Sequence, residues 1–174
     1  MDILAHALYG ATLCSETGLA GGRSGSTAPR WFRDRTFWWS LVFGVLPDGV
    51  SMWIPFTAYT IAGVERNYFL HYGGGWLTVY RAVHNLIVPL TVSAILFVLR
   101  RRLFVPSLAW TIHVVMDAVS HGAGKYQTLL FYPFSSWGIE GISWWRAPWF
   151  FAGYWLVLLA IWILIAVWRR TEDD

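Results

Sequence analysis

The sequence predicts an all-α integral membrane protein, a helical bundle with four or five short transmembrane helices. Apolar residues make up 56% of the 174 residues and charged residues only 13%, compared with roughly 25% charged residues in soluble domains. The 13 Trp and 8 Tyr residues are typical of helix ends at the depth of lipid headgroups, where one end of an amphipathic ring contacts water and the other end contacts apolar groups. The length suits a single membrane-embedded domain over residues 1–174.

Arginine side chains gather in three clusters, each beside an apolar segment. The clusters comprise Arg23, Arg30, Arg33 and Arg35; Arg100, Arg101 and Arg102; and Arg169 and Arg170. The positive-inside rule places all three clusters on the cytoplasmic side, and the apolar segments then alternate in direction. Nucleic-acid binding requires cationic residues on one folded face. We therefore expect membrane lipids as partners and no nucleic acid.

A polar loop separates the first two apolar segments. Residues 2–20 are apolar apart from a few polar side chains, which favours a helix packed against other helices. Residues 21–36 contain Gly, Ser, Pro and Arg without an apolar period and are predicted to form a loop. Residues 37–62 form a long apolar segment. Pro47 lies near its middle and is expected to break or kink the helix.

Three further apolar segments follow in the second part of the chain. A Gly-rich loop is predicted over residues 63–81, and residues 82–99 are predicted to form an apolar span that is followed by three arginines. Residues 105–120 form a shorter helix with polar side chains in its second half. The longest loop is predicted over residues 121–148, where it can cover a site. Residues 149–168 are uninterrupted apolar sequence of roughly spanning length.

Ionisable side chains recur at one depth of this predicted bundle. Four separate segments bring such groups to similar positions near the non-cytoplasmic side. The six residues are His6, Asp48, His84, His113, Asp117 and His121. A carboxylate at that depth is costly unless it is paired or ligates a cation. We therefore expect these residues to form a metal site that faces the non-cytoplasmic side.

The spacing within the fourth segment favours a single ion. His113 and Asp117 are spaced i, i+4, so both side chains leave one face of a helix, and His121 continues the series at i+8. Imidazole mixed with carboxylate suits zinc, manganese or iron better than magnesium or calcium. Zinc is the expected cofactor. Water on such an ion ionises near neutral pH and becomes a nucleophile.

Each of these residues also has a purely structural interpretation. A histidine at a membrane interface is often a hydrogen-bonded structural residue. Asp48 follows a proline and is placed to cap a helix start. His113 and Asp117 can form a satisfied polar pair that joins two helices. The metal site is favoured because so many ionisable groups coincide at one depth of a chain with few polar residues.

Three residues outside the spans are further candidates. Glu140, in the long outer loop, is either a surface residue or a carboxylate ligand of a second metal ion. Arg81 and Arg146 lie on the outer side, against the positive-inside trend. Either arginine can hold an anionic substrate such as a phosphate, or rest among the lipid headgroups.

Several short motifs resemble, in order, those of the predicted inner-membrane metal-dependent hydrolases of the YdjM-like type. They are MDILAHA at residues 1–7, LPD at 46–48, RAVHN at 81–85 and HVVMDAVSH at 113–121. TLLFYPFS at residues 128–135 and GISW at 141–144 are similar to the family's segment after the last histidine. The resemblance implies an inner-membrane location and metal-dependent hydrolysis.

The same resemblance implies a set of ligands. The family is distantly similar to zinc-dependent bacterial phospholipases C and related single-strand nucleases, which are all-helical. On that basis one ion is held by Asp48, His84, His113 and Asp117. Asp117 then bridges to another ion bound by His6, and His121 belongs to a further position with Glu140. This chain has Val50 where many family members carry a second acid, and Tyr80-Arg81 where they often carry His-Arg, which favours a single metal.

The predicted function is a membrane-bound metal-dependent hydrolase. It is expected to cleave a phosphoester or other ester of a lipid or lipid-linked substrate through a metal-activated water, with Asp48 or Asp117 as the general base. The alternative is a non-catalytic membrane scaffold, or a metal-binding or transport component. The cytoplasmic halves of the predicted helices hold almost no ionisable residue, which speaks against transport.

Overall fold

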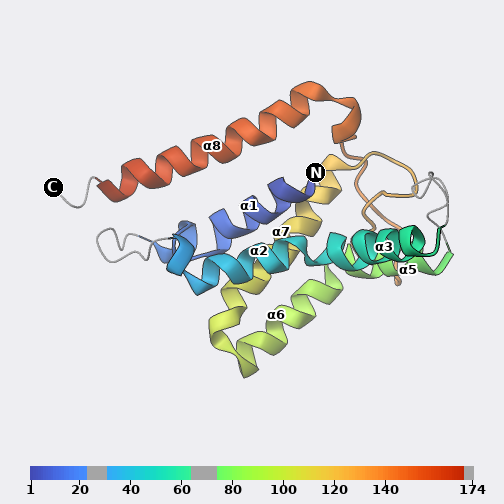
Figure 1. Cartoon of the computed structure of the whole chain (residues 1–174), viewed down its shortest axis with the longest axis horizontal. Helices are drawn as coiled ribbons and strands as arrows, with labels where there is room; N and C mark the ends of the chain where they lie inside the picture. The colour runs from blue at the N-terminus through green and yellow to red at the C-terminus, as the bar shows by residue number, and fades with distance from the viewer. Residues whose placement is uncertain (23–30, 64–73, 171–174) are drawn as a thin grey trace.

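The computed structural model describes residues 1–22, 31–63 and 74–170, except for the side chain of Arg170. Over these ranges the chain is all-helical, without a β-strand, and this confirms the all-α part of the predicted fold class (Figure 1). The elements are α1 (Ile3–Cys14), η1 (Leu19–Gly21), η2 (Trp31–Arg33), α2 (Arg35–Asp48), the π-helix η3 (Gly49–Trp53), α3 (Ile54–Ile61), α5 (Gly74–Val83), α6 (Ile87–Leu99), α7 (Arg101–Ser120), η4 (Trp144–Arg146) and α8 (Pro148–Arg170).

Three stretches are long and apolar enough to cross a membrane. They are Arg35–Ile61, Arg101–Ser120 and Pro148–Arg169. A fourth is added if α5 and α6, which are bent by 50° to each other, form one broken span. Helix α1 has 12 residues, fewer than the ~20 needed to cross the hydrocarbon core. By length and composition, the described residues therefore hold three candidate spans, or four if the bent pair is one span, compared with the predicted four or five.

Pro47 does not break the second segment, although the regular α-helix ends one residue after it. Helix α2 runs through Pro47 to Asp48 and continues as the π-helix η3. The backbone N–H of Gly49 still donates to the carbonyls of Leu46 and Val45, so the helical path is kept. The Ser51 hydroxyl donates to the Pro47 carbonyl at 2.8 Å. The irregularity is thus a widened turn directly after Asp48.

The predicted loop over residues 63–81 is wrong from Gly74 onward, where α5 begins. The run of glycines conceals a helical pattern. Trp76 and Tyr80, one turn apart, pack in the same apolar cluster, and Tyr80 is only 2% exposed. Tertiary packing therefore outweighs the low helix propensity of glycine. Residues 64–73 of the predicted loop lie outside the described residues.

Two helices begin earlier than predicted. Helix α2 begins at Arg35 rather than residue 37, because the Asp34 carboxylate caps it by accepting the backbone N–H of Thr36 at 2.8 Å. Helix α7 begins at Arg101 rather than residue 105. Pro106 lies in its second turn, near the exposed helix end, where water can satisfy the carbonyl that loses its partner.

The segment between α7 and α8 is irregular, as predicted for residues 121–148, except for the short turn η4. It folds back over the end of α7, because the backbone N–H of Gly141 donates to the His121 carbonyl at 2.9 Å. Its other side reaches α6, where the Leu86 N–H donates to the Leu130 carbonyl at 2.9 Å. The segment therefore covers the end of the bundle opposite the arginine clusters.

The arginine clusters meet at one end of the molecule. Arg33, Arg35 and Arg100–Arg102 line a common cavity. Arg169, near the end of α8, donates to the carbonyls of Glu16, Thr17 and Gly18. The start of α2 and the end of α8 lie together at the left in Figure 1. The helices therefore alternate in direction as the arginine distribution predicted.

Helix α1 packs closely against α2 and α7. The contact is tight because two glycines lack side chains. A Cβ at Gly44 would lie 2.9 Å from the His6 carbonyl oxygen, and one at Gly10 would lie 2.9 Å from Ala109 Cβ. Helix α8 runs beside α1 at the edge of the bundle (Figure 1). The Asp2 carboxylate joins the two helices by accepting from Tyr154 Oη at 2.6 Å.

We expect Gly44→Val to destabilise the protein by about 1–3 kcal/mol, because the new side chain overpacks the α1–α2 contact. The measurement is thermal unfolding of the detergent-solubilised protein, followed by circular dichroism. Gly153→Val is the matched control, since a Cβ at Gly153 meets nothing within 4 Å. Equal melting temperatures for the two variants would contradict the close packing at Gly44.

The Asp34 carboxylate links the α2 start to the segment after α1. Burial opposes its ionisation, but hydrogen bonds from Thr17 and Thr36 outweigh burial and lower the pKa of Asp34 below its usual value. A carboxylate that is more acidic in the folded state stabilises the protein above its unfolded pKa of about 3.9. This stabilisation is lost as the pH falls through the lower, folded value.

We therefore expect Asp34→Asn to be less stable than the wild type at pH 7 by about 1–2 kcal/mol. The difference should shrink as the pH falls below the unfolded pKa of about 3.9 toward the lower, folded pKa of Asp34. Thermal unfolding of both proteins between pH 7 and pH 3 measures it. A difference that stays constant over this range would show that the charge of Asp34 is not the stabilising feature.

Candidate metal centre

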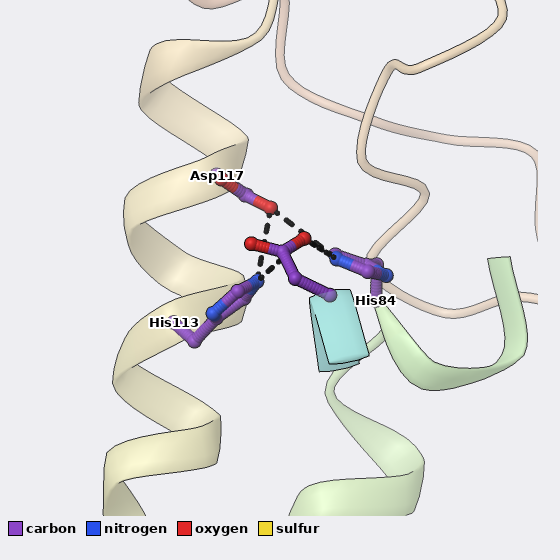
Figure 2. Close-up of side chains that lie close together, drawn as sticks. His84, His113 and Asp117 are labelled. Carbon is purple, nitrogen blue, oxygen red and sulfur yellow. Dashed lines mark hydrogen bonds and ion pairs between the residues drawn. The ribbon is translucent and has the colours of Figure 1, made fainter. Parts of the chain in front are cut away.

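Four side chains from three parts of the fold converge on one point. Asp48 ends α2, His84 lies in the bend between α5 and α6, and His113 and Asp117 lie one turn apart on α7. Ligand atoms of all four lie within 4.8 Å of one another. Figure 2 shows His84, His113 and Asp117 pointing toward one another. We call these four residues the Asp/His cluster.

Asn85 explains why the chain bends at His84. Its side-chain nitrogen donates to the carbonyls of Arg81 and Ala82 at 3.1 and 2.6 Å, which ends α5. Its side-chain oxygen accepts the backbone N–H of Val88 at 3.1 Å, which starts α6. One buried amide thus satisfies both helix ends. The bend places the imidazole of His84 beside α7.

Backbone carbonyls orient both histidines of the cluster. Nδ1 of His113 lies 2.7 Å from the Gly44 carbonyl oxygen, and Nδ1 of His84 lies 2.9 Å from the Tyr80 carbonyl oxygen. A carbonyl only accepts hydrogen bonds, so Nδ1 carries the proton in each ring. In the neutral tautomer the lone pair is then on Nε2. This is the arrangement by which proteins hold metal-ligating imidazoles.

The two Nε2 atoms face carboxylate oxygens instead of donors. Nε2 of His113 lies 3.2 Å from Asp117 Oδ2 and 3.8 Å from Asp48 Oδ1. Nε2 of His84 lies 3.3 Å from Asp48 Oδ1 and 3.5 Å from Asp117 Oδ2. Nε2 of His113 has no hydrogen-bond partner among the described residues. A lone pair that faces a carboxylate requires a proton or a cation between them.

The nitrogen–oxygen separations within the cluster are close to those of a coordination sphere. Ligand atoms about 2.1 Å from a tetrahedral zinc ion lie about 3.4 Å apart. The four nitrogen–oxygen distances of the cluster are 3.2, 3.3, 3.5 and 3.8 Å. Two imidazoles and two carboxylates also supply a suitable donor set for a divalent ion. The Asp/His cluster can therefore bind a metal ion.

His6 and His121 lie on the other side of Asp117. The His6 ring stacks on His113 with centroids 3.7 Å apart, and its Nε2 lies 2.8 Å from Asp117 Oδ1. Both nitrogens of His6 are buried without a hydrogen bond among the described residues. Nδ1 of His121 lies 3.3 Å from the same Asp117 oxygen. The other five predicted ligands thus gather around Asp117, although only four of the six residues form the compact group.

Other groups complete the surroundings of Asp117. The Met1 nitrogen donates to Asp117 Oδ1 at 2.9 Å and to Ser120 Oγ at 2.7 Å. Asp117 is 1% exposed, and both His84 and His113 side chains are fully buried. Asp48, with 14% of its side chain exposed, is the most exposed member of the Asp/His cluster.

The structure does not bring the remaining candidates into the cluster. Glu140 and Arg146 are exposed and take no part in it. Arg81 is half-buried on α5, three residues before His84, and its Nε atom is buried without a hydrogen bond among the described residues. Of these three candidates, only Arg81 lies within one helical turn of a cluster residue along the chain.

Two residues that position the cluster were absent from the sequence prediction. Gly44 contributes a carbonyl to His113, and no sequence signal marks a main-chain group in this role. Tyr80 contributes a carbonyl to His84 and stacks on its ring with centroids 4.1 Å apart. The i, i+4 spacing of Tyr80 and His84 is a helical signal, and the prediction of a loop concealed it.

Comparisons with models of protein families, with curated proteins and with solved structures gave no match for this chain. The resemblance to the YdjM-like hydrolases therefore remains a prediction from the short motifs. The possible chemistry of the site is argued below from its own geometry.

We expect Tyr80→Leu to weaken metal binding about tenfold, because it removes the ring that holds the His84 imidazole in place. The measurement is competition between the purified protein and a chelator of known affinity. Tyr80→Phe is the matched control. It keeps the stacked ring and loses only the hydroxyl that donates to the Tyr126 carbonyl at 2.9 Å, so its affinity should stay near that of the wild type. Equal losses in both variants would contradict a role for the stacking.

Proposed function

We propose that this protein is a membrane-embedded, metal-dependent hydrolase that cleaves a phosphoester of a lipid or lipid-linked substrate. The observation that carries the proposal is the Asp/His cluster, in which two oriented imidazoles present Nε2 lone pairs to two carboxylates. Zinc is the preferred ion, with manganese and iron as alternatives, because mixed nitrogen and oxygen ligands suit these metals. When bound, the ion supplies Lewis-acid polarisation of an ester and activates water.

The roles of the two carboxylates differ in this proposal. Asp117 is buried, and its oxygens are surrounded by His6, His84, His113 and His121. It is therefore a ligand and an electrostatic anchor. Asp48 is partly exposed at the edge of the cluster, so a substrate or water can approach its carboxylate. We assign Asp48 as the general base that accepts the proton from the attacking water.

The expected substrate follows from the position of the site. The three candidate spans support a membrane location, and the arginine end of the bundle belongs in the cytoplasm under the positive-inside rule. The Asp/His cluster then lies toward the non-cytoplasmic side of a cell's inner membrane. Arg81, one turn before His84, is the better candidate than the exposed Arg146 to bind the phosphate of a lipid headgroup.

One observation favours a non-catalytic alternative. The Asp/His cluster offers four protein ligands, and three of the four residues are buried. Structural zinc sites are closed in this way, whereas catalytic sites keep a position open for water or substrate. A metal-stabilised membrane scaffold would therefore show the same cluster. The two functions differ in what happens when Asp48 is changed.

The test compares metal content and hydrolysis in three detergent-purified proteins. We expect the wild type to retain near-stoichiometric zinc, manganese or iron by mass spectrometry, and the His113→Ala, Asp117→Ala double variant to lose it. Asp48→Asn should keep at least part of the metal but hydrolyse phosphoesters about 100-fold more slowly, because it lacks the base. Glu140→Gln is the control and should keep both properties.

Each contrary result has a definite meaning. A folded, undialysed wild type without metal would remove the basis of the hydrolase. Retained metal without hydrolysis of short-chain or lipid phosphoesters would support the scaffold. Metal lost in Glu140→Gln would make Glu140 the ligand of a second ion.

A further inference from the structure

A second candidate site lies at the other end of the bundle. A cavity of about 770 Å³ opens between the start of α2 and the turn that joins α6 to α7. Five arginines line it, namely Arg33, Arg35, Arg100, Arg101 and Arg102. We call it the arginine pocket. Its α7 wall begins 16 residues before Asp117 on the same helix, which is about 24 Å along the helix axis, so it is separate from the Asp/His cluster.

The arginine pocket has an excess of positive charge. Its carboxylates are those of Glu16 and Asp34. The Asp34 oxygens already accept four hydrogen bonds, from the backbone and hydroxyl groups of Thr17 and Thr36. Among the described residues, no ion pair joins either carboxylate to a pocket arginine. Since arginine stays protonated in proteins, the charge must be balanced from outside these residues.

The contacts made by the pocket arginines leave donors available. Arg100 donates one bond to the Leu99 carbonyl at 3.1 Å, and Arg101 lies over the Phe97 ring at 5.4 Å. Each guanidinium carries five N–H donors, so these contacts use a small part of them. The first turns of α2 and α7 also line the pocket, and helix N-termini favour anions.

One wall of the arginine pocket is apolar. Trp39 and Leu103 line it beside the arginines. Trp39 is 44% exposed and Val42, almost one turn further along α2, is 49% exposed. The pocket therefore continues from a cationic end onto an exposed apolar helix face. A free anion would use only the cationic end, whereas an anionic lipid would use both.

We propose that the arginine pocket binds the phosphate headgroup of an anionic phospholipid from the leaflet at the arginine end of the bundle. Guanidinium groups bind phosphate oxygens through paired, charge-assisted hydrogen bonds. The hydrocarbon chains of the lipid lie along the outer face of α2. This proposal requires the membrane location but neither a metal ion nor hydrolysis, so it stands or fails separately from the proposed function.

Native mass spectrometry of the detergent-purified full chain tests the proposal. Phosphatidylglycerol and phosphatidylcholine with identical acyl chains are titrated against the wild type and against the Arg35→Gln, Arg102→Gln variant. We expect the wild type to bind phosphatidylglycerol more tightly than phosphatidylcholine, and the variant to lose about 30-fold in affinity for phosphatidylglycerol alone.

The matched control removes the same charge from the opposite end of the bundle. Lys125→Gln, Arg146→Gln should leave phosphatidylglycerol binding unchanged. An equal loss of phosphatidylglycerol affinity in both double variants would show that only the overall charge matters, and it would overturn the assignment of the arginine pocket as the binding site. Inorganic phosphate is titrated as a competitor. Displacement of the lipid by inorganic phosphate at a similar concentration would identify a free anion as the ligand and overturn the lipid assignment.

Discussion

The buried carboxylate of Asp117 is the group on which the rest of the fold depends. A charge in a low-dielectric interior is destabilising by several kcal/mol unless other groups surround and pair with it. Histidines from α1, from the α5–α6 bend and from α7 itself approach its two oxygens. Three separate parts of the chain must therefore meet at one height on α7. The order of the helices and the bend at His84 both help to bring these histidines to Asp117.

Close approach of helix backbones makes this arrangement possible. Gly10 and Gly44 let α1 lie directly against its neighbours, where any side chain would collide with main-chain or Cβ atoms. Gly44 has a second role besides the close helix contact, because its carbonyl orients the His113 imidazole. Small residues at helix contacts are how membrane proteins gain van der Waals packing without a hydrophobic driving force. Packing and site geometry are thus coupled at one residue.

The sequence predicted what depends on local spacing or on span length. The i, i+4 spacing of His113 and Asp117 lies on one helix, and the arginine distribution placed His6 and His84 at the same depth; the structure confirms that all three histidines adjoin Asp117. The sequence did not predict α5. The glycines at the start of this helix are typical of a loop, and the burial of the helix comes from tertiary contacts. The sequence left two interpretations of Glu140 open, a surface residue or a metal ligand, because an irregular segment has no period from which a direction can be inferred; in the structure Glu140 is exposed.

The orientation of the two imidazoles by main-chain carbonyls has an evolutionary consequence. Many metal sites orient their histidines with carboxylate side chains, which a single substitution can remove. Every amino acid carries a carbonyl, so drift at the orienting positions leaves the hydrogen-bond acceptor in place as long as the helix keeps its path. Selection on the site then acts on the ligands and on the few residues that fix helix spacing. A distant homologue could share very little sequence and still build the same centre, recognisable only by isolated histidines and aspartates.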